Sequence, residues 1–272
     1  MTYSTIMVHL DGGRPNRFLL DTAAAVATRF DATVIGIAGC QPVQLGAPSS
    51  YLDGEFAVIE RDRVTDELAR LESEFHEHAG LQALTIEWRS LPVFVNVAHA
   101  VAEQARCADL IITGARPAGS GLSTHADTAD LILHAGRPVL IVPDHGATAD
   151  FATIMVAWRD TRECRRAVAD ALPMLHQASR VILVESSDDA ASARDHLADV
   201  ARWLTRHGID TDRITSLPSG PDATTLAAVA DAQGADLIVA GAYGHSRIRE
   251  WAFGGVTRDL LLQDHRCTLV AH

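Results

Sequence analysis

The sequence predicts an α/β protein built from two tandem parallel sheets of five strands each, and three observations support this. Short apolar runs of strand length alternate with longer stretches whose apolar residues recur at helical spacing, which is typical of βαβ units. Segments of the first half of the chain return in the second half, so the chain is a repeat. The central strand runs are apolar almost throughout, as expected for strands that helices cover on both faces.

Three pairs of segments make up the repeat. Thr5-Ile6-Met7-Val8 returns at 153–156, and Ala108-Asp109-Leu110-Ile111-Ile112 returns in similar form at 235–239. Each half then closes on an apolar run that follows an arginine, Arg137 or Arg266. The offsets, 148 and 127 residues, differ by 21, so the first half holds about that many extra residues. We expect them as a loop at 41–61, where proline, glycine and serine cluster.

The expected elements follow in order along each half. The strands of the first half are predicted at 6–10, 33–38, 85–91, 110–113 and 138–142. Those of the second half are predicted at 154–158, 181–185, 209–217, 237–240 and 267–271. Apolar stripes at helical spacing predict helices through Cys164 to Leu175 and Leu197 to Leu204, and Asp222 is placed to cap a helix through Ala232. The stretch 143–151 lacks apolar periodicity, so we predict domains at 1–146 and 147–272.

The composition excludes several classes of protein. All 23 basic residues are arginine and 35 residues are acidic, which gives a net charge of −12. Affinity for nucleic acid comes mostly from basic side chains on phosphates, so we expect no nucleic-acid partner. A Walker A loop, a pyridoxal enzyme and a protein kinase each need a lysine that this chain lacks.

The apolar content of 47% is not gathered into any membrane-spanning run. The N-terminus shows no basic region followed by an apolar stretch, so we expect no secretory signal and no membrane partner. The four cysteines, which are scattered without a CxxC pair, are expected as buried core residues in a reducing cytoplasm.

The richest candidate site follows the fourth strand of the second half. Ligands of an open parallel sheet bind outside the carboxyl ends of the strands. That strand runs into Gly241 and Gly244, and after nine intervening residues come Gly254 and Gly255 before a helical stretch. Backbone N–H groups at a helix N-terminus form an anion site without lysine. The segment 244–258 contains three arginines and one glutamate. It is equally consistent with a triphosphate-binding loop and with a solvated glycine-rich surface loop.

The pattern Gly-x2-Gly-x9-Gly at the end of a fourth strand resembles the nucleotide-binding motif of the universal stress protein family. The resemblance covers essentially the whole chain, and the turn from Val156-Ala157-Trp158 into Asp160 is similar to the first-strand turn of many members. It implies two Rossmann-like domains of strand order 3-2-1-4-5 that pack as an intrachain pseudo-dimer through their last strands. It also implies an adenine nucleotide such as ATP or AMP, with any Mg²⁺ brought by the nucleotide, and a role in stress response or signalling with at most weak hydrolysis.

The family's site carries over residue by residue onto the second half. The resemblance implies backbone contacts from the three motif glycines and further contacts from the hydroxyl segment and a loop arginine: Gly241, Gly244, Gly254, Gly255, Val256, Thr257 and Arg247. Gly255 stands where many nucleotide binders have Ser or Thr, which removes one hydrogen bond of about 0.5–1.5 kcal/mol. Arg159 takes the position of the family's first-strand aspartate, so either Asp160 serves instead or Arg159 reaches a phosphate.

The first half keeps the fold pattern but departs from the motif. Gly114 aligns with Gly241, whereas Pro117 replaces the second glycine and removes an N–H. Aligning Thr128 with Thr257 puts His125 and Ala126 where Gly254 and Gly255 stand, although Asp11 matches the family's acidic position. We expect one binding half and one structural half, with Gly119 and Gly121 left as a candidate for another anion nest.

Other chemistries have weaker support. His76 and His78 lie two apart on a helical stretch and point to different faces, so we expect no metal site. Ser246 follows Gly244 as in a nucleophile elbow, but Ile248 stands where the last glycine is needed, so we name no catalytic residue. Three functions stay open: an adenine-nucleotide binder, a protein that acts only through partner contacts, and a slow ATP hydrolase. A homodimer of tandem chains is also left open.

Overall fold

The computed structural model describes residues 2–13, 15–41, 54–92, 96–114, 124–144, 149–217, 222–242 and 265–272. The elements of the first half are β1 (Thr5–His9), α1 (Arg17–Phe30), β2 (Thr33–Cys40), α2 (Gly54–Glu77), β3 (Ile86–Pro92), α3 (Val97–Gln104), β4 (Leu110–Gly114), α4 (Thr128–Ala135) and β5 (Val139–Val142). Those of the second half are β6 (Thr153–Ala157), α5 (Arg162–Gln177), β7 (Arg180–Ser186), α6 (Ala190–Arg206), β8 (Asp212–Ser216), α7 (Asp222–Gln233), β9 (Leu237–Gly241) and β10 (Cys267–Ala271). Two short 3-10 turns, Ala79–Leu81 and Ala105–Cys107, precede β3 and β4.

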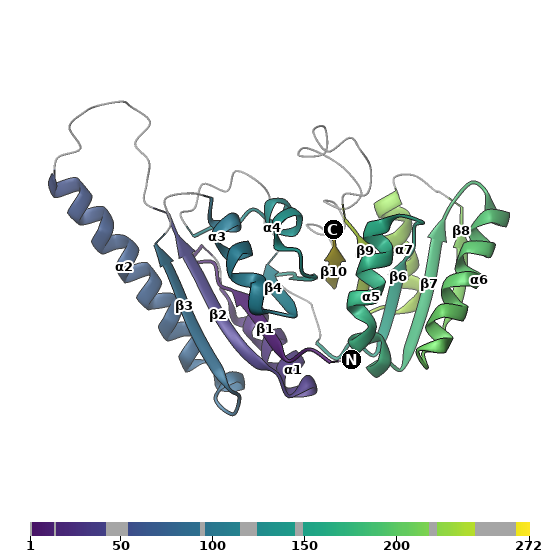
Figure 1. Ribbon diagram of the computed structural model, residues 1–272, viewed down its shortest axis with the longest axis horizontal. Coiled ribbons are helices and arrows are strands. Elements are labelled where there is room, and N and C mark those ends of the chain that lie inside the picture. Colours follow the sequence, from purple (N-terminus) through teal and green to yellow (C-terminus); the bar gives the residue numbers. More distant parts are fainter. Residues whose placement is uncertain are drawn as a thin grey trace.

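The ten strands form one sheet in the order β3-β2-β1-β4-β5-β10-β9-β6-β7-β8. Each half therefore has the order 3-2-1-4-5, which confirms the predicted architecture. Neighbours within each half are parallel, whereas β5 and β10 pair antiparallel with Ile141 opposite Thr268. The halves thus join through their last strands at the centre of the sheet (Figure 1).

The predicted strands agree with the structure within two residues at almost every end. The third strand of the second half starts at Asp212, not 209, because Ile209 is buried in the turn after α6, where its N–H donates to the carbonyl of Leu204. The expectation of a loop through Arg61 is wrong, because α2 begins at Gly54. The extra length of the first half lies partly in α2, which has 24 residues where α6 has 17.

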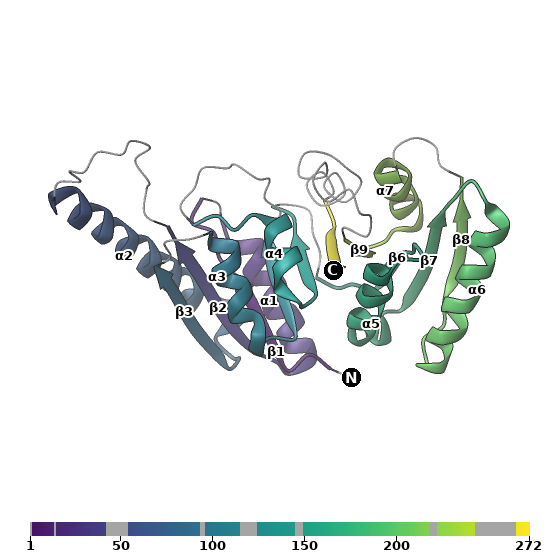
Figure 2. The ribbon, with the colours of Figure 1, turned by 45° about the horizontal axis from the view of Figure 1, so that its top comes forward.

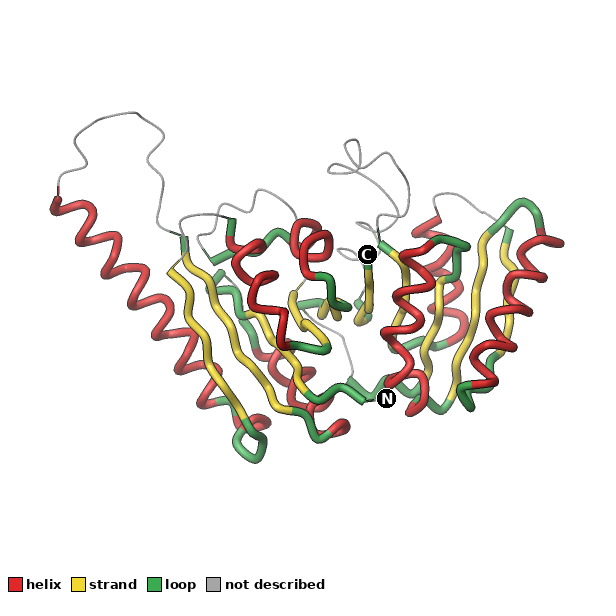
Figure 3. Tube along the Cα trace, viewed as in Figure 1, coloured by secondary structure: helices red, strands yellow, loops and turns green. Residues whose placement is uncertain are grey.

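Helices cover both faces of the sheet, as Figures 2 and 3 show. One continuous core packs α1, α2, α5 and α6 against a single face of both halves, and Ile6, Val34, Ile154 and Leu183 contribute to it from the strands. On the opposite face, α3 and α4 cover the first half and α7 covers part of the second.

The cysteines are all free thiols in the structure. Cys40, Cys164 and Cys267 are buried as expected, and burial raises the pKa of Cys164 to about 11. The prediction is wrong for Cys107, which is exposed at the turn before β4, where its thiol accepts a hydrogen bond from Arg89. In this turn the side chain of Ala105 faces the core and is buried, whereas those of Arg106 and Cys107 face solvent.

Contacts besides the β5–β10 pair hold the halves together. The Tyr3 hydroxyl donates to the carbonyl of Asp170 at 2.6 Å, and burial raises the pKa of Tyr3 so that the hydroxyl stays protonated. Arg29 lies 3.5 Å from the carboxylate of Asp150. Val270 of β10 packs within the first half's α3–α4 core, so the two halves share apolar side chains. Among the described helices, none is long and apolar enough to cross a membrane.

Candidate functional site

The carboxyl ends of β6 and β9 lie side by side in the second half. Ala157 pairs with Ala240, which places the turn that follows β6 next to Gly241 at the end of β9. The structure thus brings together three predicted site residues, Gly241, Arg159 and Asp160. The other predicted site residues lie outside the described residues, namely Gly244, Arg247, Gly254, Gly255, Val256 and Thr257.

Gly241 is fixed by the packing of a helix. A Cβ at this position would lie 2.7 Å from the Cα of Cys164 and 2.8 Å from the carbonyl carbon of Glu163, both backbone atoms of the first turn of α5. The absence of a side chain lets that helix start directly over the end of β9. The structure therefore supplies a packing reason for this glycine, which the sequence suggested only as a place of close approach to a ligand.

Arg159 and Asp160 are both exposed in the turn between β6 and α5. A carboxylate oxygen of Asp160 accepts from Arg165 at 2.6 Å. The next residue, Thr161, caps α5 by accepting from the N–H of Cys164. Both alternatives for the first-strand position remain, because an arginine and an aspartate are exposed side by side at the carboxyl end of β6.

Two polar residues that sequence reasoning missed lie beside this turn. Glu185, nine-tenths buried near the end of β7, accepts from Nδ1 of His196 on α6 at 3.1 Å. The hydrogen bond to Glu185 raises the pKa of His196, and the charge of Asp160 adds to the effect. The available signal was a glutamate that ends an otherwise apolar run, Val181 to Glu185.

At the corresponding place in the first half, the acidic residue Asp11 is engaged by groups of the chain itself. Asp11, which is 4% exposed, accepts from the N–H of Gly13 at 2.9 Å and from the hydroxyl of Thr124 at 3.0 Å. Nδ1 of His125 lies 3.7 Å from its other oxygen. Burial favours the neutral acid, but His125, the N–H of Gly13, His9 and Thr124 together hold the pKa of Asp11 well below its ordinary range. The acidic residue predicted from the family pattern is thus engaged within the protein.

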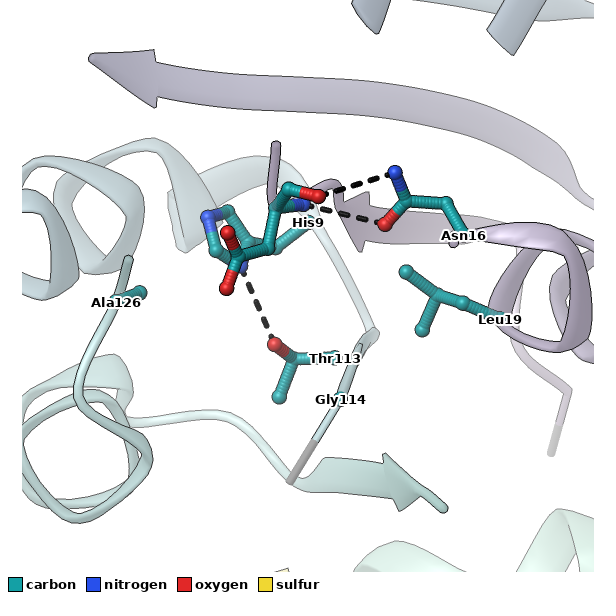
Figure 4. Close-up of a pocket in the computed structure, with 7 residues that line it drawn as sticks. His9, Asn16, Leu19, Thr113, Gly114 and Ala126 are labelled. Carbon is teal, nitrogen blue, oxygen red and sulfur yellow. Dashed lines mark hydrogen bonds between the residues drawn. The ribbon is translucent and has the colours of Figure 1, made fainter. Parts of the chain in front are cut away.

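Below Asp11, the ends of β1 and β4 leave no volume for a water-sized molecule between the described side chains. His9 contacts the hydroxyl of Thr113 at 3.2 Å, and Asn16 holds the backbone of Asp11 (Figure 4). The carboxylate of Asp127 caps α4 by accepting from the N–H of Asp130. An anion at this helix N-terminus would have to displace a carboxylate that is already there.

Solved structures resemble this architecture over its full length. A universal stress protein from Archaeoglobus fulgidus DSM 4304 matches with a TM-score of 0.67 and 14% identity over 98% of this chain and 95% of that one. The chain has the universal stress protein fold. A putative universal stress protein from Pseudomonas aeruginosa UCBPP-PA14 matches with a TM-score of 0.59 and 16% identity over 99% of this chain and 93% of that one.

Shorter universal stress proteins match about half of the chain. One from Archaeoglobus fulgidus, solved in complex with dAMP, covers 52% of this chain and 98% of its own length at 21% identity and a TM-score of 0.31. The sequence matches no protein-family model and no curated protein, so the likeness to universal stress proteins is one of fold.

Proposed function

We propose that this protein is a universal stress protein that binds an adenine nucleotide in its second half, as a regulatory binder without rapid turnover. The glycine pattern of the chain begins at the residue that ends β9, and this observation carries the proposal. In an open sheet of order 3-2-1-4-5, that residue lies at the point where ligands bind.

The described part of the crevice fits a nucleotide in position and charge. Arg159 offers a cation to a phosphate and Asp160 offers an acceptor to a hydroxyl or amino group, and both are exposed beside Gly241. The segment 244–258 has a net charge of +2, from three arginines and one glutamate, in a chain of −12. We infer backbone and hydroxyl contacts for its glycines, Val256 and Thr257, and a phosphate contact for Arg247.

The contrast between the halves supports a single site. In the first half, Asp11 is already engaged by Gly13 and Thr124, and α4 is already capped by Asp127. We therefore infer one nucleotide per chain, a binding domain at 147–272 and a structural domain at 1–146. ATP with Mg²⁺ and a cytoplasmic location belong to the same proposal.

Isothermal titration of the full chain with ATP and with AMP tests it, with and without Mg²⁺. We expect one equivalent to bind, and Gly244→Asp to abolish binding by setting a carboxylate against the phosphates. Pro117→Asp, at the position of the first half that aligns with Gly244, is the matched control and leaves binding unchanged. Absence of heat at millimolar nucleotide, together with no nucleotide released on denaturing fresh protein, would refute the proposal.

Two further variants test which of the residues that follow β6 contacts the nucleotide. If Arg159 contacts a phosphate, Arg159→Ala lowers the affinity for ATP about tenfold and leaves the affinity for adenosine unchanged. If Asp160 contacts the nucleoside, Asp160→Asn lowers the affinity for ATP and for adenosine by the same factor. Product formation that depends on enzyme concentration and disappears in Gly244→Asp would favour the slow hydrolase instead.

A further inference from the structure

A cavity of about 400 Å³ lies between α5 and α6, on the helix-covered face of the second half. Its lining combines two indole rings, two valines and two charged side chains, which are Trp158, Trp203, Val168, Val200, Arg165 and Asp199. Two of the chain's four tryptophans thus line one cavity. Its volume is in the range of small-molecule pockets, which are mostly apolar with a few polar groups.

In the first half, hydrogen bonds link the two helices that correspond to α5 and α6. Four buried residues of α2 recur with the same spacing in α6: Val64, Leu68, Leu71 and Phe75 correspond to Ala193, Leu197, Val200 and Leu204. By this correspondence Trp203 takes the place of Glu74, and by the repeat offset Cys164 takes the place of Asn16. In the first half, Glu74 accepts from the backbone and side chain of Asn16 at 3.1 and 3.0 Å, which binds α2 to the start of α1.

The second half has lost that polar link and gained aromatic surface. Cys164 is buried and its thiol faces the carbonyl of Ala157, so it offers no link to α6. Trp158 stands where the first half has Leu10, so two positions around the space changed from smaller or polar residues to tryptophan. A larger ring at both positions would be expected to fill the space, yet a cavity remains between them.

The charges at the rim narrow the class of ligand. Arg165 and Asp199 are more than half exposed, and each already pairs with a neighbour, Asp160 or Arg202. One charge of each sign gives no net attraction for a strongly charged molecule, whereas indole faces attract planar rings by offset or edge contacts. We propose that the cavity between α5 and α6 binds a small planar aromatic molecule, neutral or zwitterionic. The cavity borders the nucleotide site, because Arg165 at its rim pairs with Asp160, but none of the residues predicted to bind the nucleotide lines it. The proposal does not rest on the proposed nucleotide function.

Ligand-observed ¹⁹F NMR with 5-fluoroindole as the probe tests the proposal on the full chain. We expect saturable broadening with wild-type protein. Val200→Phe, which fills the cavity from α6, removes it, and Trp203→Glu, which restores the first half's residue, weakens binding at least about tenfold. Val58→Phe makes the same exchange at an exposed position of α2 and leaves binding unchanged.

Far-UV circular dichroism and thermal unfolding test whether each variant is folded. If Val200→Phe does not fold, Trp203→Glu provides the test of the cavity. No saturable broadening up to the solubility of the probe would overturn the proposal. Broadening that survives in folded Val200→Phe would do the same. The proposal would also be overturned if sedimentation velocity showed a wild-type dimer that dissociates in the cavity variants, because a second copy of the chain would then cover the cavity.

Discussion

The contact between Gly241 and α5 makes Gly241→Ala the most direct test of the packing at the crevice. The added methyl group would lie 2.7 Å from the Cα of Cys164 and 2.8 Å from the carbonyl carbon of Glu163. These are backbone atoms, so no side-chain rotation relieves the contact, and either α5 or β9 must move. Overpacking of this kind costs about 1–3 kcal/mol. For a chain of this size that corresponds to a loss of about 2–12 °C in Tm.

Gly12→Ala is the matched control. Its nearest obstacle is the end of the Glu67 side chain, which belongs to the surface of α2 and can rotate away. Thermal unfolding followed by circular dichroism, with urea titration at 25 °C, compares the two variants. A loss of stability in Gly241→Ala no greater than in Gly12→Ala would refute the view that α5 requires a glycine there.

Three further predictions concern the buried polar groups. Asp11→Asn keeps the shape but weakens two charge-assisted hydrogen bonds, so we expect a loss of about 1–2 kcal/mol in urea unfolding at pH 7. Because the folded-state pKa of Asp11 is lowered, this difference persists above about pH 4 and shrinks as the pH falls below that value; an unchanged difference at pH 2.5 would contradict it. His196 has a raised pKa beside Glu185, so its contribution is present below about pH 6.5 and lost as the pH rises through its folded-state pKa. His196→Gln should therefore lower the urea midpoint at pH 5.5 more than at pH 9, and equal effects would count against the pair. Tyr3→Phe removes the hydrogen bond to Asp170 across the halves and should cost about 1 kcal/mol, measured in the same titration.

The central strands could be predicted because each is a short apolar run bounded by polar or glycine residues, whereas the edge strands β3 and β8 carry polar and charged residues. Their order came from the resemblance, because apolar periodicity does not say which strands are neighbours. The start of α2 at Gly54 was missed because loop-forming residues mark only where a strand stops, not how soon the next helix begins. Cys107 was misplaced for a related reason, since sequence alone does not show that a turn carries it to the surface.

For the site, too, the sequence predicts some residues, whereas their contacts appear only in the folded chain. Gly241 could be chosen from the spacing of glycines, but its contact with the backbone of Cys164 depends on where α5 begins, which no local pattern shows. The acidic position at Asp11 was visible in the sequence. Its partner Thr124 is 113 residues away, so only the folded chain shows that the carboxylate is engaged. Glu185 and His196 come from different elements and become neighbours only through the packing of α6 on β7.

The antiparallel junction of β5 with β10 has a consequence for assembly. The strand edges through which two separate domains could pair are joined within one chain, and among the described strands β3 and β8 are the outermost. Both of those strands bear charged side chains, Glu87 and Arg89 on one and Asp212 and Arg213 on the other. Charges on an edge strand oppose the addition of another strand. Growth by sheet extension is therefore blocked at the centre and disfavoured at both ends, which favours the helices and loops as the surfaces for any further association of this chain.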